Sequence, residues 1–139
     1  MLMSCPGNRE RYRVALLDRR EKEHARCVQA LREITGRLVS SEAVLTETLW
    51  LVGGLRDGPR LCAEFVRRGT VTLVPISQES LVRAVDLMAQ YRNVPMDFAD
   101  ATLVTLGEEL DLDSVFTLDR RGFAVYRLHG RRPFQIVPS

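Results

Sequence analysis

The sequence has few of the residues that mark secreted, disulfide-bonded or zinc-binding proteins. Its three cysteines, Cys5, Cys27 and Cys62, are odd in number, lie far apart and form no CxxC pair. We therefore expect neither a disulfide framework nor a zinc site, and a reducing cytoplasm is the compartment that fits such a chain. The two histidines, His24 and His129, have no carboxylate or cysteine at metal-ligand spacing, so we predict surface positions for both.

Long apolar runs and a strong charge of one sign are absent as well. No stretch approaches the roughly 20 apolar residues of a membrane span, and the opening MLMSCPGNRERYR lacks the apolar core of a signal peptide, so no membrane contact is expected. The net charge of +2 is too small to indicate nucleic-acid binding. Lys22 is the only lysine among twenty basic residues, a bias that we attribute to base composition, although arginine suits bidentate phosphate contacts.

What is present is an ordinary globular composition. A chain of 139 residues with 45% hydrophobic and 27% charged residues suits one domain with one core. We predict a single domain over residues 1–139, in which residues 1–13 form an irregular start. Trp50, the only tryptophan, is expected in the core or at an interface.

Hydrophobic periodicity predicts helices that alternate with short apolar strands. The predicted helices cover 14–34, 42–54, 58–69, 77–91 and 96–110, the strands cover 36–41, 70–76 and 113–119, and two extended segments follow at 123–128 and 134–138. Ser77 is the expected N-cap of the fourth helix. Such alternation implies parallel crossovers, and we predict an α/β fold, a three-layer α/β/α sandwich with a mostly parallel sheet.

Two aspartates open the helix of the stretch VPMDFADATLVTLGEEL. Asp97 suits the first turn, where a carboxylate complements the helix macrodipole. Asp100 lies a full turn further, on a stripe that borders the apolar face. An unpaired carboxylate is costly to desolvate there, so we expect Asp100 to need a partner such as a cation.

Two further acids stand in unusual places. Glu47 falls on a largely apolar helical face, and Asp119 follows VFTL at the carboxyl end of a strand, where ligands gather in α/β sheets. Alone, an acid such as Asp119 at a strand end is more often a helix cap or a turn former, and DRRG would make a sensible turn. Carboxylates brought together repel one another, so one must be protonated or a hard cation such as Mg²⁺ or Mn²⁺ must enter. Paired-metal sites of this kind activate water for phosphodiester hydrolysis.

The stretches LTETLWLVGG, PMDFADATLVTLGEEL and VFTLDRRGFAVYRLHGRRPF resemble the successive acidic motifs of the PIN domain, particularly VapC-type toxin ribonucleases. The resemblance runs from about Val14 to the C-terminus. It implies that Glu47, Asp100 and Asp119 ligate Mg²⁺ or Mn²⁺, with Asp97 as an auxiliary acid.

The same resemblance implies a metal-dependent endoribonuclease, the toxin of a toxin–antitoxin pair. Its expected partners are an RNA substrate, a cognate antitoxin and a second copy of the chain in a homodimer, and its expected location is the cytoplasm. The pairs Arg120–Arg121 and Arg131–Arg132 either contact RNA phosphates or are solvated surface pairs.

The start of the chain departs from the family, which begins with a hydrophobic strand ending in an Asp. We therefore predict that the first strand is missing or altered. Three explanations stay open: a mis-assigned or frameshifted start, a degenerate paralogue, or a shifted register in which YRVALLD is the first strand and Asp18 the first acid. We interpret Asp18 as a solvated residue of the first helix.

Two other functions compete with the ribonuclease. A catalytically impaired homologue would act as a binding module for an antitoxin or RNA, as the missing first Asp suggests. A receiver-like phospho-acceptor domain would also gather acids, but such domains use a lysine late in the sheet, and Lys22 is the sole lysine.

Overall fold

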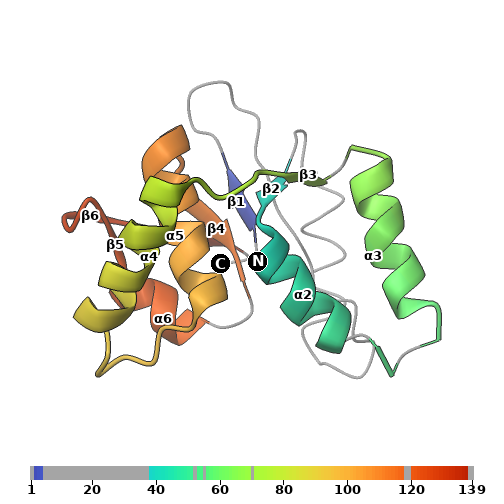
Figure 1. Ribbon diagram of the computed structural model, residues 1–139, viewed down its shortest axis with the longest axis horizontal. Helices are drawn as coiled ribbons and strands as arrows, with labels where there is room; N and C mark the ends of the chain where they lie inside the picture. The colour runs from blue at the N-terminus through green and yellow to red at the C-terminus, as the bar shows by residue number, and fades with distance from the viewer. Residues whose placement is uncertain are drawn as a thin grey trace.

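The computed structural model describes residues 2–4, 38–51, 53–54, 56–69, 71–117 and 120–137 (Figure 1). The helices are α2 (Glu42–Leu51), α3 (Gly58–Arg67), α4 (Gln78–Gln90), α5 (Phe98–Leu110) and α6 (Arg120–Val125). The strands are β1 (Leu2–Ser4), β2 (Leu38–Ser40), β3 (Val71–Leu73), β4 (Ser114–Phe116), β5 (Arg127–Leu128), β6 (Arg132–Pro133) and β7 (Gln135–Val137). Predictions for the helix 14–34, for Asp18 and for Asp119 fall outside these ranges.

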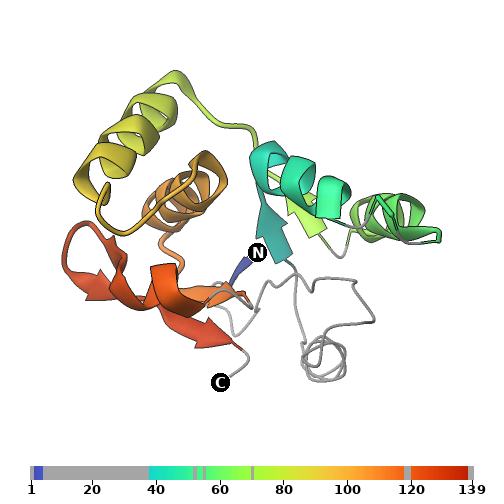
Figure 2. The ribbon, with the colours of Figure 1, turned by 90° about the horizontal axis from the view of Figure 1, so that it is seen from below.

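The described strands form a five-stranded sheet in the order β3-β2-β1-β4-β7 and a small β5–β6 hairpin. β2 is parallel to β3, β4 is parallel to β7, and β1 is antiparallel to both of its neighbours. Every strand of the larger sheet except β1 therefore points the same way. The predicted α/β/α sandwich with a mostly parallel sheet is confirmed, and Figures 1 and 2 show α2, α4 and α5 together on one side of the sheet.

The central strand β1 is the altered element that the sequence predicted. Leu2 lies opposite Phe116 at the carboxyl end of β4, and Ser4 lies opposite Ser114 at the amino end. Because β1 runs backwards, its own carboxyl end is at the edge of the sheet where the parallel strands begin. The carboxyl end of β1 therefore lies away from the edge at which ligands bind in parallel sheets.

Helices α4 and α5 begin where their N-caps predict. Ser77 Oγ accepts a hydrogen bond from the Ser80 amide, and Asp97 accepts one from the Asp100 amide. Nine residues in the first ten positions of α5 are buried, so this helix is surrounded by protein. It ends at Asp111, whose left-handed backbone (φ 53°) suits a helix C-terminus. The core gathers around α5.

The tail differs from the prediction of two extended segments. Segment 134–138 does contain β7, but within 123–128 only Arg127 and Leu128 are extended, because Phe123 belongs to α6. The helical turn places Phe123 and Tyr126 side by side, with ring centroids 5.1 Å apart and both rings buried. Gly122 permits this packing, since a Cβ atom there would lie 2.6 Å from Tyr126 Oη. Of the two ordinary explanations for the acid of DRRG, a turn or a helix cap, the turn is not formed by the described residues, because those from Arg120 onward are helical.

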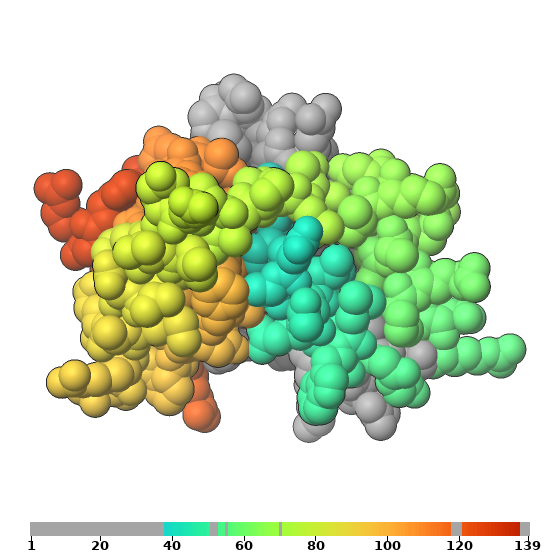
Figure 3. Space-filling view, viewed as in Figure 1, coloured from blue at the N-terminus to red at the C-terminus, as the bar shows by residue number. Residues whose placement is uncertain are grey.

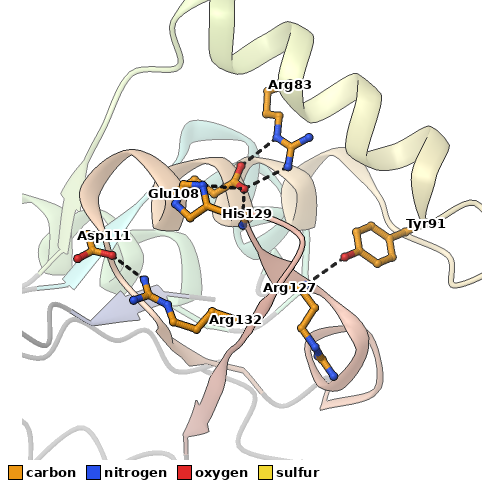
Figure 4. A network of polar contacts seen from close by, with 7 residues as sticks. All are labelled: Arg83, Tyr91, Glu108, Asp111, Arg127, His129 and Arg132. Carbon is orange, nitrogen blue, oxygen red and sulfur yellow. Dashed lines mark hydrogen bonds and ion pairs between the residues drawn. The ribbon is translucent and has the colours of Figure 1, made fainter.

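A partly buried carboxylate ties the hairpin to the two long helices (Figure 4). Glu108 of α5 accepts two hydrogen bonds from the Arg83 guanidinium of α4, at 3.0 and 3.1 Å, and one from the His129 amide at 2.7 Å. Nearby, Arg132 donates to Asp111 at 2.6 Å. The His129 side chain itself is exposed, as predicted.

Candidate acidic active site

Glu47 reaches the site from the middle of α2. Ser41 precedes the helix, and its Oγ accepts a hydrogen bond from the Val44 amide at 3.2 Å, which is the geometry of an N-cap. Val44 and Thr48 are buried, whereas Glu47 itself is exposed. Glu47 therefore lies at the border of the apolar face of α2 rather than within it.

Asp97 and Asp100 come from the start of α5. Asp97 Oδ1 accepts the Asp100 amide at 2.8 Å, which confirms the capping role and leaves Asp97 exposed. The Asp100 side chain turns inward, and only 7% of this residue is exposed. The sequence prediction of one capping acid and one acid at the core border holds for this pair.

The fold brings Glu47 to these two aspartates. Partial burial and the neighbouring Asp97 raise the pKa of Glu47 to about 6. Burial, then the charge of Asp97 and of Glu47, raise the pKa of Asp100 to about 7. Each carboxyl group makes ionisation of the next more costly, as expected for acids that share one small volume.

The carboxylates of this cluster are chemically suited to bind a divalent cation. Carboxylate oxygens are the ligands that Mg²⁺ and Mn²⁺ prefer, and a cation would relieve the repulsion that raises the two pKa values. Within the described ranges, however, no group of three or more His, Cys, Asp or Glu side chains is arranged to hold a metal ion. The predicted third ligand, Asp119, is outside those ranges, so the complete ligand set stays a prediction.

A hollow of about 690 Å³ opens beside the acids. It is lined by residues from three segments, 41–47 at the start of α2, 74–76 before α4, and 97–102 at the start of α5, and both Glu47 and Asp97 contribute to its wall. Figure 3 shows the surfaces of these segments meeting on one face, with α2 in cyan between α5 and the segment before α4. The acids therefore border a space that can receive a ligand.

Two hydroxyl groups that sequence reasoning missed join α2 to α5 in this wall. Ser41 Oγ and Thr102 Oγ1 lie 2.7 Å apart and are buried. Thr102 donates its own proton to the Ala99 carbonyl at 2.7 Å, so Ser41 is the donor in the pair. A serine before a helix and a threonine in an apolar run are the only sequence signals, and neither indicates that the two residues meet.

Other residues singled out in the sequence lie apart from the acids. Trp50 is 82% exposed and does not pack in the core, which leaves the interface alternative. Arg121, Arg131 and Arg132 are all exposed, and Arg132 pairs with the exposed Asp111, so contact of these arginines with RNA stays a prediction. The Arg120 side chain is outside the described set.

Comparison with known families agrees with this geometry. The PIN domain family matches residues 13–128, which is most of the chain, and the chain belongs to this family. PIN domains are usually nucleases that act on RNA and generally use divalent metal ions. The match begins where the irregular start was predicted to end. A search of curated proteins finds no significant match.

In the part of the chain that the structure describes, none of the helices has the length and apolar character needed to span a membrane.

Proposed function

We propose that this protein is a metal-dependent endoribonuclease that hydrolyses RNA phosphodiester bonds in the cytoplasm, as the toxin of a toxin–antitoxin pair. The observation that carries the proposal is the convergence of Glu47, Asp97 and Asp100, from α2 and the start of α5, beside a hollow that Glu47 and Asp97 line. Membership of a family of nucleases supports the reaction type.

Each acid has a separate part in this proposal. Glu47, Asp100 and Asp119 hold Mg²⁺ or Mn²⁺, which when bound supplies an activated water and neutralises charge on the phosphate. Asp97 caps α5 and thereby fixes the backbone of Asp100. The burial of Asp100 keeps bulk water from one side of the site, which strengthens its interaction with any cation.

The proposed toxin role needs protein partners, an antitoxin and a second copy of the chain. Two exposed apolar features support contact with a protein. Trp50 stands on α2, and α4 presents Leu81, Val82 and Val85, which are 44%, 62% and 54% exposed. A tryptophan exposed to this degree is typical of an interface rather than of a free surface.

A catalytically impaired homologue that binds an antitoxin or RNA is the second candidate. The reversed β1 favours it, because the central strand does not direct its carboxyl end toward the acids. This candidate predicts a folded protein that binds but does not cleave.

Cleavage of a mixed RNA panel separates the two candidates. The purified chain is incubated with Mg²⁺, Mn²⁺ or chelator, beside Asp100→Asn and the matched control Asp86→Asn, an exposed acid on α4. The endoribonuclease requires cleavage that depends on metal, is lost in Asp100→Asn and survives in Asp86→Asn. A well-folded chain that cleaves nothing with either metal would establish the binding module instead.

A further inference from the structure

The described polar side chains that line the hollow carry only carboxyl or hydroxyl groups. Its described polar side chains are three carboxylates and three hydroxyls, namely Glu42, Glu47, Asp97, Ser41, Thr46 and Thr102. None of the described lining residues is basic. Among the described lining residues a phosphate group would meet only negative charge and hydroxyl oxygens, so we infer that the part of a ligand that contacts them is uncharged or carries hydrogen-bond donors.

The hydroxyl groups of the wall already use their protons inside the protein. Thr46 Oγ1 donates to the Glu42 carbonyl at 2.9 Å, and Thr102 Oγ1 donates to the Ala99 carbonyl. Ser41 donates to Thr102, because the Thr102 proton is engaged elsewhere. With their protons committed, these hydroxyls offer a ligand only lone pairs, as the carboxylates do. The described polar part of the wall therefore offers a ligand only hydrogen-bond acceptors.

The remaining wall is apolar and partly open. Val74, Pro75 and Ile76 form one side, and Phe98 lies on another, at the first position of α5. Ile76 is 40% exposed, so its side chain is available to a ligand. An apolar wall with one aromatic ring is the surface on which unpaired RNA bases stack.

We propose that this hollow is a nucleobase subsite, which takes an unpaired base with an exocyclic amino group from the nucleotide next to the cleaved phosphodiester. The inference rests on the proposed ribonuclease function and names the part of the substrate recognised. Glu42 accepts the amino group, while Ile76 and Phe98 hold the faces of the base. Adenine, cytosine and guanine each bring an amino group to the acceptors, whereas uracil has none and presents two carbonyl oxygens and a single N–H.

The subsite is tested by binding in chelator, where metal-dependent cleavage is silent. Fluorescently labelled octamers of A, C or U are titrated with the full chain. We expect the A and C octamers to bind about tenfold more tightly than the U octamer, the discrimination that one well-placed base contact supplies. Equal affinity for all three, or no binding of any, would overturn the subsite.

Variants of the lining residues then test whether the wall of the hollow causes the difference in affinity between the octamers. Glu42→Gln keeps the side-chain length and adds an amide donor for a uracil carbonyl, so it should bring the C and U affinities together. Its matched control is Glu79→Gln, also a glutamate in the first turn of a helix. Discrimination that persists unchanged in Glu42→Gln contradicts the role of Glu42 and with it the proposal.

The apolar wall has its own pair of variants. Ile76→Ser should weaken the binding of A, C and U octamers alike, while Leu61→Ser on α3, at a similarly exposed position (42% against 40%), should not. If Ile76→Ser and Leu61→Ser weaken octamer binding equally, the proposal that the apolar wall holds the base is contradicted. Failure of the ribonuclease is seen separately, as absence of RNA cleavage with Mg²⁺ or Mn²⁺, and does not alter what the chelator experiment reports.

Discussion

At the scale of single residues, Asp100 combines a buried position with two acidic neighbours. Its carboxyl group gains no basic partner among the described residues, and its pKa rises to about 7. A protein that needed only a helix cap would have no reason to place a second acid there, because Asp97 already caps α5. The energetic cost of Asp100 supports the proposed metal site, because a cation would offset the repulsion between these acids.

This cost predicts how stability depends on pH in the metal-free protein. An acid whose pKa is higher in the folded state binds more protons when folded, so the free energy of unfolding falls as pH rises from 3.8 to about 7 for Asp100. Glu47 adds a smaller loss between 4.5 and about 6. Asp100→Asn should flatten the profile and raise stability at pH 8 by on the order of a few kcal/mol.

Urea unfolding in chelator at pH 5 and pH 8 measures this effect. Asp86→Asn removes an exposed acid of α4 and should leave the profile as in the unmodified protein. If Asp100→Asn keeps the full loss of stability between the two pH values, Asp100 is not the group that titrates.

At the scale of elements, a buried hydrogen bond joins α2 to α5 in addition to their apolar packing. Ser41 and Thr102 are 61 residues apart in the chain, and their 2.7 Å contact joins the start of α2 to the first turns of α5. Glu47 and Asp100 are on the same two helices. The contact therefore holds the two parts of the acidic cluster at a fixed separation.

Removal of this contact should destabilise the protein and misplace Glu47. Thr102→Val keeps the shape but leaves Ser41 without its partner, at an expected cost of about 1–3 kcal/mol. Thr105→Val is the matched control, because Thr105 is also buried in α5 and bonds only to the Thr102 carbonyl of its own helix. Equal losses for both variants in urea unfolding would mean that the link between the helices contributes nothing special.

The Glu108 network is a second junction between elements (Figure 4). Burial would raise the pKa of Glu108, but Arg83 and the His129 amide outweigh it and hold the pKa below its usual value. Stability from this carboxylate is therefore present at neutral pH and lost as pH falls through that lowered pKa. The network binds α4 and the β5–β6 hairpin to the end of α5.

Glu108→Gln should reveal the strength of this junction. The amide cannot accept both Arg83 contacts, and we expect a loss of about 1–3 kcal/mol at pH 7. Glu109→Gln changes the adjacent exposed glutamate and serves as the control. Thermal unfolding at pH 7 reports the difference, and indistinguishable midpoints for the two variants would show that the network is dispensable.

Some elements were predictable from local pattern, and others were not. Ser77 and Asp97 begin their helices as predicted, because an N-cap is formed by residues only three positions apart. Helix α6 was missed, since FAVYRL alternates like a strand. Its helical form is decided by the packing of Phe123, Tyr126 and Phe134, whose rings meet edge to face.

At the scale of the whole molecule, a bound metal would connect elements that are far apart in sequence. Glu47 lies on α2, Asp100 on α5, and the predicted ligand Asp119 follows β4. A ligand that binds only the folded state stabilises it by about 2.7 kcal/mol at a hundred times its dissociation constant. We expect saturating Mn²⁺ to raise the melting temperature by about 5 °C or more.

Asp100→Asn should not respond to Mn²⁺, and Asp86→Asn should respond as the unmodified chain does. Differential scanning calorimetry at pH 7.5 with and without metal makes this comparison. A Mn²⁺ effect of the same size in all three proteins would place the metal elsewhere.

The sequence by itself determined the α/β class, the caps of α4 and α5, the proximity of Asp97 to Asp100 and the membership of the PIN family, because each depends on residues close together or on the order of motifs. Only the tertiary structure decided that Glu47 joins the two aspartates, that Ser41 meets Thr102 and that β1 runs backwards through the sheet. Periodicity describes which face of an element is buried. It does not describe which distant element covers that face, and that choice is made by packing over the whole chain.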